Sequence, residues 1–421
     1  MPRRRELPPL LAGFAPKLAL VVIAGLLLRA VYALWFAPPT AGIMDAFYFK
    51  ELGRLVADGH GFSSPHELIF RGRETPTAEH PPLYSLVLAL EWKLGISSDA
   101  AQRATGALLG AATIALVGLV GRRVGGERVG LVAAGLAAAY PLLVSTDGAL
   151  LSETLYLPLV ALALLAAYRL RDRPSAVAAL ALGAAIGAAV LTRGEALLLL
   201  PLLAAPAAWG GGEGRVKRLA ACCLAAAVVV APWVARNWVV FDRLLLSNNV
   251  GGLVAQTNCR QAYSGPNRGG LVPACLGPRV GADEAEQASH WHRKGAEYAR
   301  GHLGDLAPAA AVRLLRTWGL WQPLGAVKDA ESHNANVQRI GIAAFYLLAA
   351  AAVGGAVALR RRREPLALLL APVIMVSVVS VLSYGNLRLR AAAEVPLVLL
   401  AAVGLVALRA RLRPLSSSRD G

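Results

Sequence analysis

Charged residues are scarce in this sequence: Asp, Glu, Lys and Arg make up 16% of its 421 residues, against about 25% in average soluble domains. A soluble fold of this length would need many more polar positions to cover its surface. Instead, 56% of the residues are hydrophobic and the mean hydropathy is +0.52. The shortage of charge therefore excludes an ordinary soluble domain.

Several motifs of soluble enzymes are also missing. The sequence has no P-loop and no GxGxxG, so a soluble-nucleotide site has no support. It has neither HExxH nor CxxC, and the two-residue spacing of His290 and His292 makes their side chains diverge on a helix. We therefore expect no structural zinc site, and we leave the use of a divalent metal open.

Acidic residues number 26 against 43 Lys and Arg, which gives a net charge of +17. In a soluble protein this excess would suggest nucleic acid. Here the arginines occur mostly in short clusters between apolar blocks, which is typical of membrane topology signals. We expect no nucleic-acid partner.

Long apolar blocks are abundant, and each is about as long as the hydrocarbon core of a bilayer is thick. The sequence predicts an all-α polytopic membrane protein with about ten transmembrane helices. They lie at approximately 16–37, 103–121, 128–146, 151–170, 175–192, 195–210, 217–236, 338–359, 365–384 and 391–408.

The arginine clusters predict the orientation of these spans. With the N-terminus inside, every dense cluster falls on the inner side, as the positive-inside rule requires. The clusters lie at 122–128, 169–173, 215–218, 360–363 and 409–413. Arginines also occupy positions 3–5, before a first block that is too long for a signal peptide, so we expect an uncleaved first span.

We divide the chain into a catalytic membrane module (1–236), an outside loop (237–337) and C-terminal helices with a basic tail (338–421). The first module contains another outside loop, 38–102. Within it, counting the short apolar stretch 83–95 as a span would break the charge rule, so we interpret it as an interfacial or re-entrant helix.

The same loop contains a candidate amphipathic helix after Asp45. Phe49, Leu52 and Val56 recur at helical spacing there, which predicts a helix lying in the membrane interface.

Cysteine is rare, with four residues. Cys222 and Cys223 fall inside a predicted span, where free thiols behave as small hydrophobes. Cys259 and Cys275 share the 237–337 loop, and an outside compartment permits disulfides. We expect a Cys259–Cys275 bridge, which would contribute about 3 kcal/mol in the chain-entropy model; two separate thiols are the alternative.

Ionisable residues gather at the predicted outer ends of the spans. Such groups are costly at membrane depth and tend to be functional or paired. The acids are Asp45, Glu79, Asp147, Glu153, Glu195 and Glu394, and the bases are His80, Arg193, Arg388 and Arg390. Their combination is expected of a site that binds a phosphate and also needs a base.

Each of these residues also has a simpler interpretation. Asp45 could cap a helix, and Asp147 and Glu153 could favour the start of the fourth span through the helix dipole. Glu79-His80-Pro81-Pro82 could be a rigid polar turn. Arg193 could pair only with Glu195, and Arg388 and Arg390 could be outside anchors of the spans. Only the joint placement of all these residues favours a functional site.

In order along the chain, the motifs resemble the GT-C class of membrane glycosyltransferases. Asp45 is followed by Glu79-His80-Pro81-Pro82-Leu83-Tyr84 and then by Gln102-Arg103. Further matches are Leu151-Ser152-Glu153, Leu191-Thr192-Arg193, Pro232-Trp233 with Arg236-Asn237, and Tyr384-Gly385-Asn386-Leu387-Arg388-Leu389-Arg390. The resemblance is strongest to protein O-mannosyltransferase-like enzymes and the lipid A aminoarabinose transferase, and it covers nearly the whole chain except 240–337.

The resemblance implies sugar transfer from a polyprenyl-phosphate donor to an acceptor hydroxyl on the outside of a bacterial cytoplasmic membrane. It places Asp45 at the first-loop catalytic acid and Glu153 at the second acidic position. Arg388 or Arg390 takes the late basic position, and His80 stands where the aminoarabinose enzyme has Lys. The acidic pair of the mannosyltransferases is absent, because Ala46 follows Asp45.

We therefore expect Asp45 and Glu153 to be catalytic, with Asp45 as the base. The candidates for substrate binding are Glu79, His80, Arg193, Arg388 and Arg390. The expected partners are the lipid-phosphate sugar, a protein, glycan or lipid acceptor, and the membrane lipids; no cofactor is required. A polytopic lipid or sugar transporter and a non-catalytic assembly protein are the alternatives.

Overall fold

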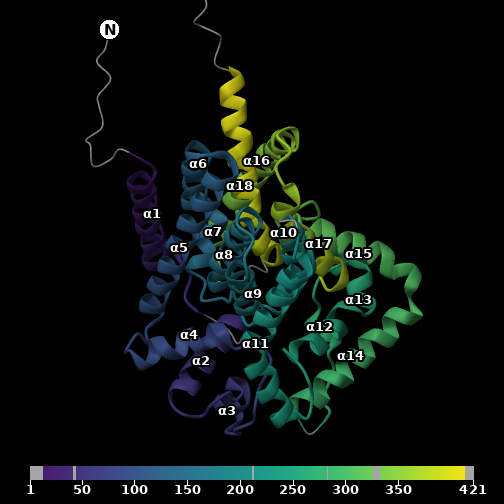
Figure 1. Ribbon diagram of the computed structural model, residues 1–421. Helices are drawn as coiled ribbons and strands as arrows, with labels where there is room; N and C mark the ends of the chain where they lie inside the picture. Colours follow the sequence, from purple (N-terminus) through teal and green to yellow (C-terminus); the bar gives the residue numbers. More distant parts are fainter. Residues whose placement is uncertain (1–12, 41–43, 211–212, 282, 326–331, 413–421) are drawn as a thin grey trace, which may run out of the picture.

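The computed structural model describes residues 13–40, 44–210, 213–281, 283–325 and 332–412 (Figure 1). Every regular element within these ranges is a helix. The predicted all-α polytopic fold is therefore confirmed. The arginines at 3–5 and the end of the basic tail lie outside the described residues.

Among the described residues, six helices are long and apolar enough to cross a membrane. They are α1 with the turn after it (Phe14–Phe36), α5 (Asp99–Gly125), α8 (Glu153–Asp172), α11 (Arg215–Phe241), α16 (Ala335–Arg361), and the turn η7 with α18 (Leu387–Leu412). Each coincides with a predicted span.

The other four predicted spans are present as bent or shorter helices. They are the pair α6 (Glu127–Ala139) and α7 (Pro141–Asp147), then α9 (Ala176–Val190), the irregular segment Gly194–Trp209 that ends in α10 (Ala205–Trp209), and α17 (Leu366–Leu382). The number of helices that cross the membrane stays a prediction.

The bend of 60° between α6 and α7 has a local cause. Pro141 is the first residue of α7, and the residue before a proline is driven out of the helical region. Tyr140 accordingly has extended dihedrals, φ −69° and ψ 116°. The third predicted span is therefore present as two helices rather than one.

The remaining helices belong to the two long loops. In Figure 1 those of the first loop lie at the bottom, opposite the end from which α18 projects, and those of the second loop lie on the right, from near the bottom up to mid-height. From the first loop they are α2 (Asp45–Ala57), α3 (Pro65–Arg71) and α4 (Leu83–Lys93). From the second loop they are α12 (Asn249–Thr257), α13 (Arg260–Tyr263), α14 (Glu284–Gly301) and α15 (Leu303–Thr317).

The apolar face of α2 packs against α4. Phe49 and Leu52, two of the residues at helical spacing, form a cluster with Tyr84 and Leu88 of α4 and Leu155 of α8. These apolar residues of α2 and α4 are thus used in packing, and this attaches the middle of α2 to the start of α8. The stretch 83–95 is a helix as predicted; its depth in the membrane stays a prediction.

In the second loop, Cys259 and Cys275 form a disulfide, whereas Cys222 and Cys223 are free. Cys275 and Tyr263 belong to a small buried cluster that includes Ala309 of α15. The disulfide therefore lies over a core of its own, separate from the core between the long helices.

A buried ion pair ties α1 to the bend between α6 and α7. Arg29 and Asp147 are 1% and 2% exposed, and Arg29 Nε donates to Asp147 Oδ2 at 2.5 Å. The other guanidinium nitrogens donate to the carbonyls of Ala137 and Ala138, near the break. The pair depends on a glycine, because a Cβ at Gly110 would lie 2.1 Å from Asp147 Oδ2.

We predict that Asp147→Ala destabilises the protein by about 3–5 kcal/mol, because it leaves the Arg29 charge buried without a partner. The double variant Arg29→Met/Asp147→Leu removes both charges and should be markedly more stable than the single variant. Thermal unfolding of the purified protein in detergent measures the difference. Equal instability of the two variants would contradict this account.

Candidate active site

Arg388 connects two acidic residues from distant parts of the chain. Its Nη1 lies 3.0 Å from Asp45 Oδ2, while its Nε and Nη2 donate to the two oxygens of Glu153 at 2.9 and 3.2 Å. Asp45 begins α2, Glu153 begins α8, and Arg388 lies on η7 (Leu387–Arg390). Three segments that the sequence separates by more than a hundred residues therefore meet at one guanidinium.

Local structure positions this arginine. Asn386 precedes the turn η7, and its side-chain oxygen accepts a hydrogen bond from the Arg388 backbone N–H at 2.9 Å. Asn386 N–H in turn donates to Thr317 Oγ1, which attaches the turn to α15. The backbone at Arg388 is thus fixed independently of the acids that its side chain contacts.

Glu153 is the most buried member of the network, with a side chain 3% exposed. A second arginine, Arg193, donates to Glu153 Oε1 at 2.8 Å and to Glu195 at 2.6 Å. The expected pairing of Arg193 with Glu195 is therefore present, but Arg193 also contacts Glu153. Two guanidiniums offset the cost of burying the one carboxylate.

Asp45 is more accessible, with 32% of its side chain exposed. It is the first residue of α2, whereas Met44 occupies the N-cap. Burial opposes ionisation, but the neighbouring Arg388 and His80 lower the pKa of Asp45 below its usual value. Asp45 is thus an ionised carboxylate with an open side.

His80 lies beside Asp45, with its Nε2 3.7 Å from Asp45 Oδ1. Its ring packs against Tyr48 and Phe49, at centroid distances of 5.0 and 4.9 Å. Burial lowers the pKa of His80 below its usual value, although Asp45 opposes this effect. His80 is therefore a neutral imidazole at pH 7 and supplies no fixed positive charge.

Glu79 differs from the other acids. Within the described part of the chain, its carboxylate has no ion-pair or hydrogen-bond partner. Burial, followed by the negative charges of Glu284 and Asp45, raises the pKa of Glu79 to about 8. At neutral pH it is mostly a protonated acid that can donate a hydrogen bond.

The structure brings together six of the ten outer ionisable residues: Asp45, His80, Glu153, Arg193, Glu195 and Arg388. Glu79 adjoins this group. Asp147 is not part of this group, because it pairs with Arg29.

Arg390, a candidate for substrate binding, and Glu394 pair with each other and not with this group. Arg390 is 1% exposed, donates to Glu394 at 2.6 Å and lies over the ring of Phe345. Arg388 and Arg390 are two residues apart on a 3₁₀ turn, so their side chains point in different directions. Only one of the two late arginines reaches Asp45.

A cavity of about 50 Å³ adjoins Arg388 and Glu153. Thr146, Gln338 and Asn386 add polar groups to its lining, and Gln338 donates to Ser145 at 2.8 Å. Gln338 was not among the predicted site residues, although a polar amide at the first position of the predicted span 338–359 was a usable signal.

No group of three or more His, Cys, Asp or Glu side chains that could hold a metal ion occurs within the described ranges. The network holds two arginines where a cation would otherwise balance the acids. The use of a metal stays open.

Comparison with known protein families finds a match over part of the chain. Residues 79–236 match the family described as dolichyl-phosphate-mannose-protein mannosyltransferase. This segment contains the Glu79-His80-Pro81-Pro82 motif, Glu153 and Arg193. No curated protein sequence matches the chain.

Three solved structures are similar to the chain. The archaeal oligosaccharyltransferase AglB from Archaeoglobus fulgidus, in complex with an inhibitory peptide and a dolichol-phosphate, has a TM-score of 0.54 at 14% identity, over 97% of this chain and 52% of AglB. Its apo form has a TM-score of 0.55 at 14% identity, over 95% and 51%. ArnT from Cupriavidus metallidurans bound to undecaprenyl phosphate has a TM-score of 0.45 at 17% identity, over 94% and 79%.

The chain spans about half the length of AglB, and the identities are too low for the similarity to show more than a shared fold. The predicted fold and the partial family match nevertheless agree with it. The chain therefore has the GT-C fold of the membrane glycosyltransferases that its sequence resembles.

Proposed function

We propose that the protein is a membrane glycosyltransferase that moves a sugar from a polyprenyl-phosphate donor to an acceptor hydroxyl on the outer side of the cytoplasmic membrane. The observation that carries the proposal is the contact of one arginine, Arg388, with two acids, Asp45 and Glu153. The family match over 79–236 and the dolichol-phosphate in the AglB structure support the choice of a lipid-phosphate donor.

In this proposal Arg388 binds the donor phosphate. Glu153 holds Nε and Nη2 of its guanidinium, so Nη1, which faces Asp45, is the nitrogen that a phosphate oxygen can take over. Arginine suits this role because its planar fork donates several hydrogen bonds to one anion. The phosphate then replaces Asp45 as the partner of Nη1.

Released from Arg388, Asp45 is the proposed base. The acceptor hydroxyl loses its proton to the Asp45 carboxylate while its oxygen bonds to the anomeric carbon. The bond from that carbon to the phosphate oxygen breaks, and polyprenyl phosphate leaves. Arg388 stabilises the charge that develops on this leaving group.

The neighbouring residues have supporting roles. Glu153, held also by Arg193, keeps the Arg388 fork in one orientation. His80 restrains Asp45 from the other side as a neutral ring. Glu79 is proposed to bind substrate as a hydrogen-bond donor. Arg390 is left out of the phosphate site because its side chain is 1% exposed and pairs with Glu394 rather than with Asp45 or Glu153.

The orientation of the site is part of the proposal. Asp45 begins α2, which lies at the end of the molecule opposite the one from which α18 projects (Figure 1), and Arg388 contacts Asp45. The arginine clusters between spans favour the opposite end as the cytoplasmic side. The site would then face outward, where a lipid-linked sugar presents its headgroup.

We predict that Asp45→Asn lowers the rate of transfer by about 100-fold or more, since general-base catalysis typically contributes about 10²–10⁴-fold. The assay follows release of polyprenyl phosphate from a panel of polyprenyl-phosphate sugars by the purified protein. Asp58→Asn, at the exposed end of the same helix, is the matched control. Near-normal turnover of a folded Asp45→Asn protein would remove the assigned role.

We predict that Arg388→Ala weakens donor binding by about 10- to 100-fold, as expected for the loss of hydrogen bonds to a charged group worth about 1.5–3 kcal/mol. Titration of the donor into the purified protein measures the affinity. The control is Arg339→Ala, an exposed arginine near the start of α16 that bonds only Asn336. An unchanged donor affinity would exclude Arg388 from the phosphate site.

We predict a pH-dependent effect of Glu79→Gln on stability. The folded-state pKa of Glu79 is raised to about 8, so the neutral acid stabilises the wild type at low pH, and this contribution is lost as the pH rises through about 8. Glutamine cannot ionise, so the variant should gain thermal stability relative to wild type at pH 9 and match it below pH 5.

The measurement is the midpoint of thermal unfolding in detergent from about pH 5 to 9. Glu74→Gln, an exposed residue of the same loop, is the control. A difference between wild type and Glu79→Gln that does not change with pH would contradict the raised pKa.

A further inference from the structure

A second, larger cavity lies apart from the proposed active site. It has a volume of about 400 Å³ and lies between the residues that follow α11, the start of α12, and one face of α14. None of Asp45, Glu153 and Arg388 lines it. We call it the α14 groove; the residues on which the argument depends are Arg243, Arg293, Arg300, His292, Ser289 and Val250.

The lining of the α14 groove contains three arginines and a histidine but no Asp or Glu. Within the described ranges, Arg293 and Arg300 make no ion pair, and Arg243 donates to the hydroxyl of Ser289 at 2.5 Å. Asp242 and Glu297 are exposed nearby, yet neither pairs with these arginines. A cluster of like charges without acids raises the local potential and favours the binding of an anion.

The shape of the groove follows from the sequence of α14. Residues 285, 288, 292, 296 and 300 recur at helical spacing on one face. Three of them are alanines, at 285, 288 and 296, which leave room for a ligand. His292 and Arg300 belong to this face and Arg293 adjoins it, whereas Arg243 lines the groove from the segment that follows α11.

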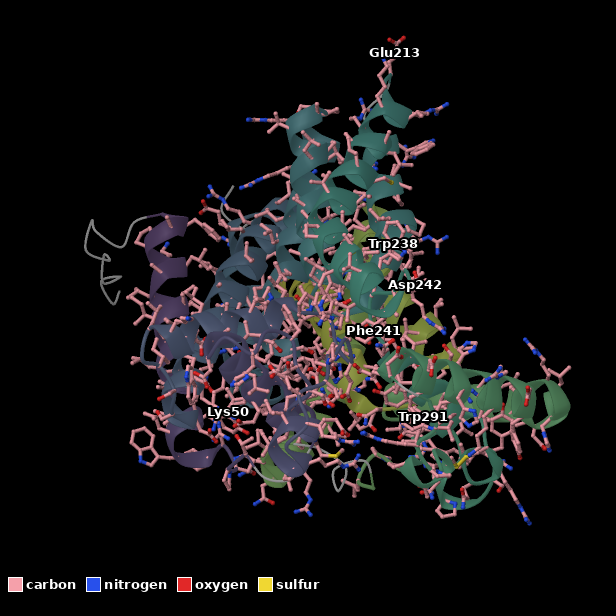
Figure 2. The ribbon with its side chains drawn as sticks, turned by 90° about the horizontal axis from the view of Figure 1, so that it is seen from below. Lys50, Glu213, Trp238, Phe241, Asp242 and Trp291 are labelled. Atoms are coloured by element: carbon pink, nitrogen blue, oxygen red, sulfur yellow. A yellow bond between two sulfur atoms is a disulfide. The ribbon has the colours of Figure 1, made fainter. Side chains whose placement is uncertain are left out.

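The position of the groove indicates what kind of anion it takes. It begins directly after α11, a candidate span. Only 17% of the apolar 18-residue stretch of α11 is buried inside the protein. Trp238, Val239, Leu244 and Val250 are 58%, 85%, 76% and 55% exposed. Figure 2 shows Trp238 and Asp242 at this end of α11 and Trp291 on α14.

Apolar residues this exposed on a span contact lipid tails, and tryptophan favours the membrane–water boundary. The arginines therefore begin at the level where lipid headgroups lie. A soluble acidic protein or a nucleic acid would not need the apolar residues that border the groove.

The groove is also attached to the proposed active-site loop. Asn248, which lines it, donates its backbone N–H to the carbonyl of Ala78 at 2.8 Å. Ser247, another lining residue, donates its hydroxyl to the carbonyl of Glu79. An occupant of the groove would therefore lie behind the segment that carries Glu79 and His80.

We propose that the α14 groove binds the anionic headgroup of a membrane lipid, with the acyl chains lying along the exposed apolar surface at the end of α11. The arginines of α14 bind the headgroup and Val250 contacts the start of the chains. This site is additional to the donor-phosphate site at Arg388, and it does not depend on transfer activity.

The test is native mass spectrometry of the full-length protein in detergent, titrated with phosphatidylglycerol or with phosphatidylcholine of the same acyl chains. We expect more phosphatidylglycerol than phosphatidylcholine adducts on the wild type. Arg293→Ala/Arg300→Ala should lose one phosphatidylglycerol adduct and weaken the tightest binding by about tenfold or more. Arg260→Ala, an exposed arginine of the same loop outside the groove, is the matched control and should bind like wild type.

Two further arms identify the ligand class. Glycerol 3-phosphate should not compete at concentrations equal to those of the lipid, and polyglutamate should not displace the lipid. Displacement by either compound would overturn the proposal in favour of a soluble phosphate or an acidic polypeptide. Equal phosphatidylglycerol binding by wild type and the double variant would overturn it as well.

Because binding is read directly, the result is independent of the transfer assay. Loss of lipid binding in the double variant would stand even if the protein transferred no sugar. Conversely, if the double variant transfers sugar and binds lipid like wild type, the proposed function stands and the lipid site in the α14 groove is overturned.

Discussion

The contact of the Arg388 guanidinium with both Asp45 and Glu153 is the interaction around which the proposed active site is organised. The three residues come from η7, α2 and α8, and none of these segments is near another in the sequence. A carboxylate as buried as Glu153 is tolerated only when cations and hydrogen bonds replace its water. Arg388 and Arg193 supply them, so the network helps to hold the first loop over the long helices.

Buried arginine–carboxylate pairs occur elsewhere in the fold, and their differences indicate which are structural. Arg29 with Asp147, and Arg390 with Glu394, are pairs of one cation and one acid with side chains at most 4% exposed. The Arg388 network instead shares two arginines among three carboxylates, and one of these, Asp45, keeps an open side. A ligand phosphate can replace a protein carboxylate only where the arginine has more than one acidic partner and the carboxylate is accessible.

The charged residues of the two proposed sites lie in two places. Around Arg388, acids and arginines occur together and nearly balance, whereas the α14 groove contains arginines without acids. The Ser247 hydroxyl and the Asn248 backbone N–H join the two places through hydrogen bonds to the carbonyls of Glu79 and Ala78. This part of the second loop therefore lies against the segment that carries Glu79 and His80.

The helices of this protein were determined by sequence alone, because apolar periodicity and block length are properties of neighbouring residues. The bend before Pro141 is likewise local, since a proline acts on the residue before it. One motif contains both Arg388 and Arg390. Arg390 meets Glu394 only four positions later, a spacing that a helix by itself brings together, whereas the pairing of Arg388 with Asp45 and Glu153 was decided by the tertiary structure. The contacts of Arg388 join residues hundreds of positions apart, and these form only when the whole chain is folded.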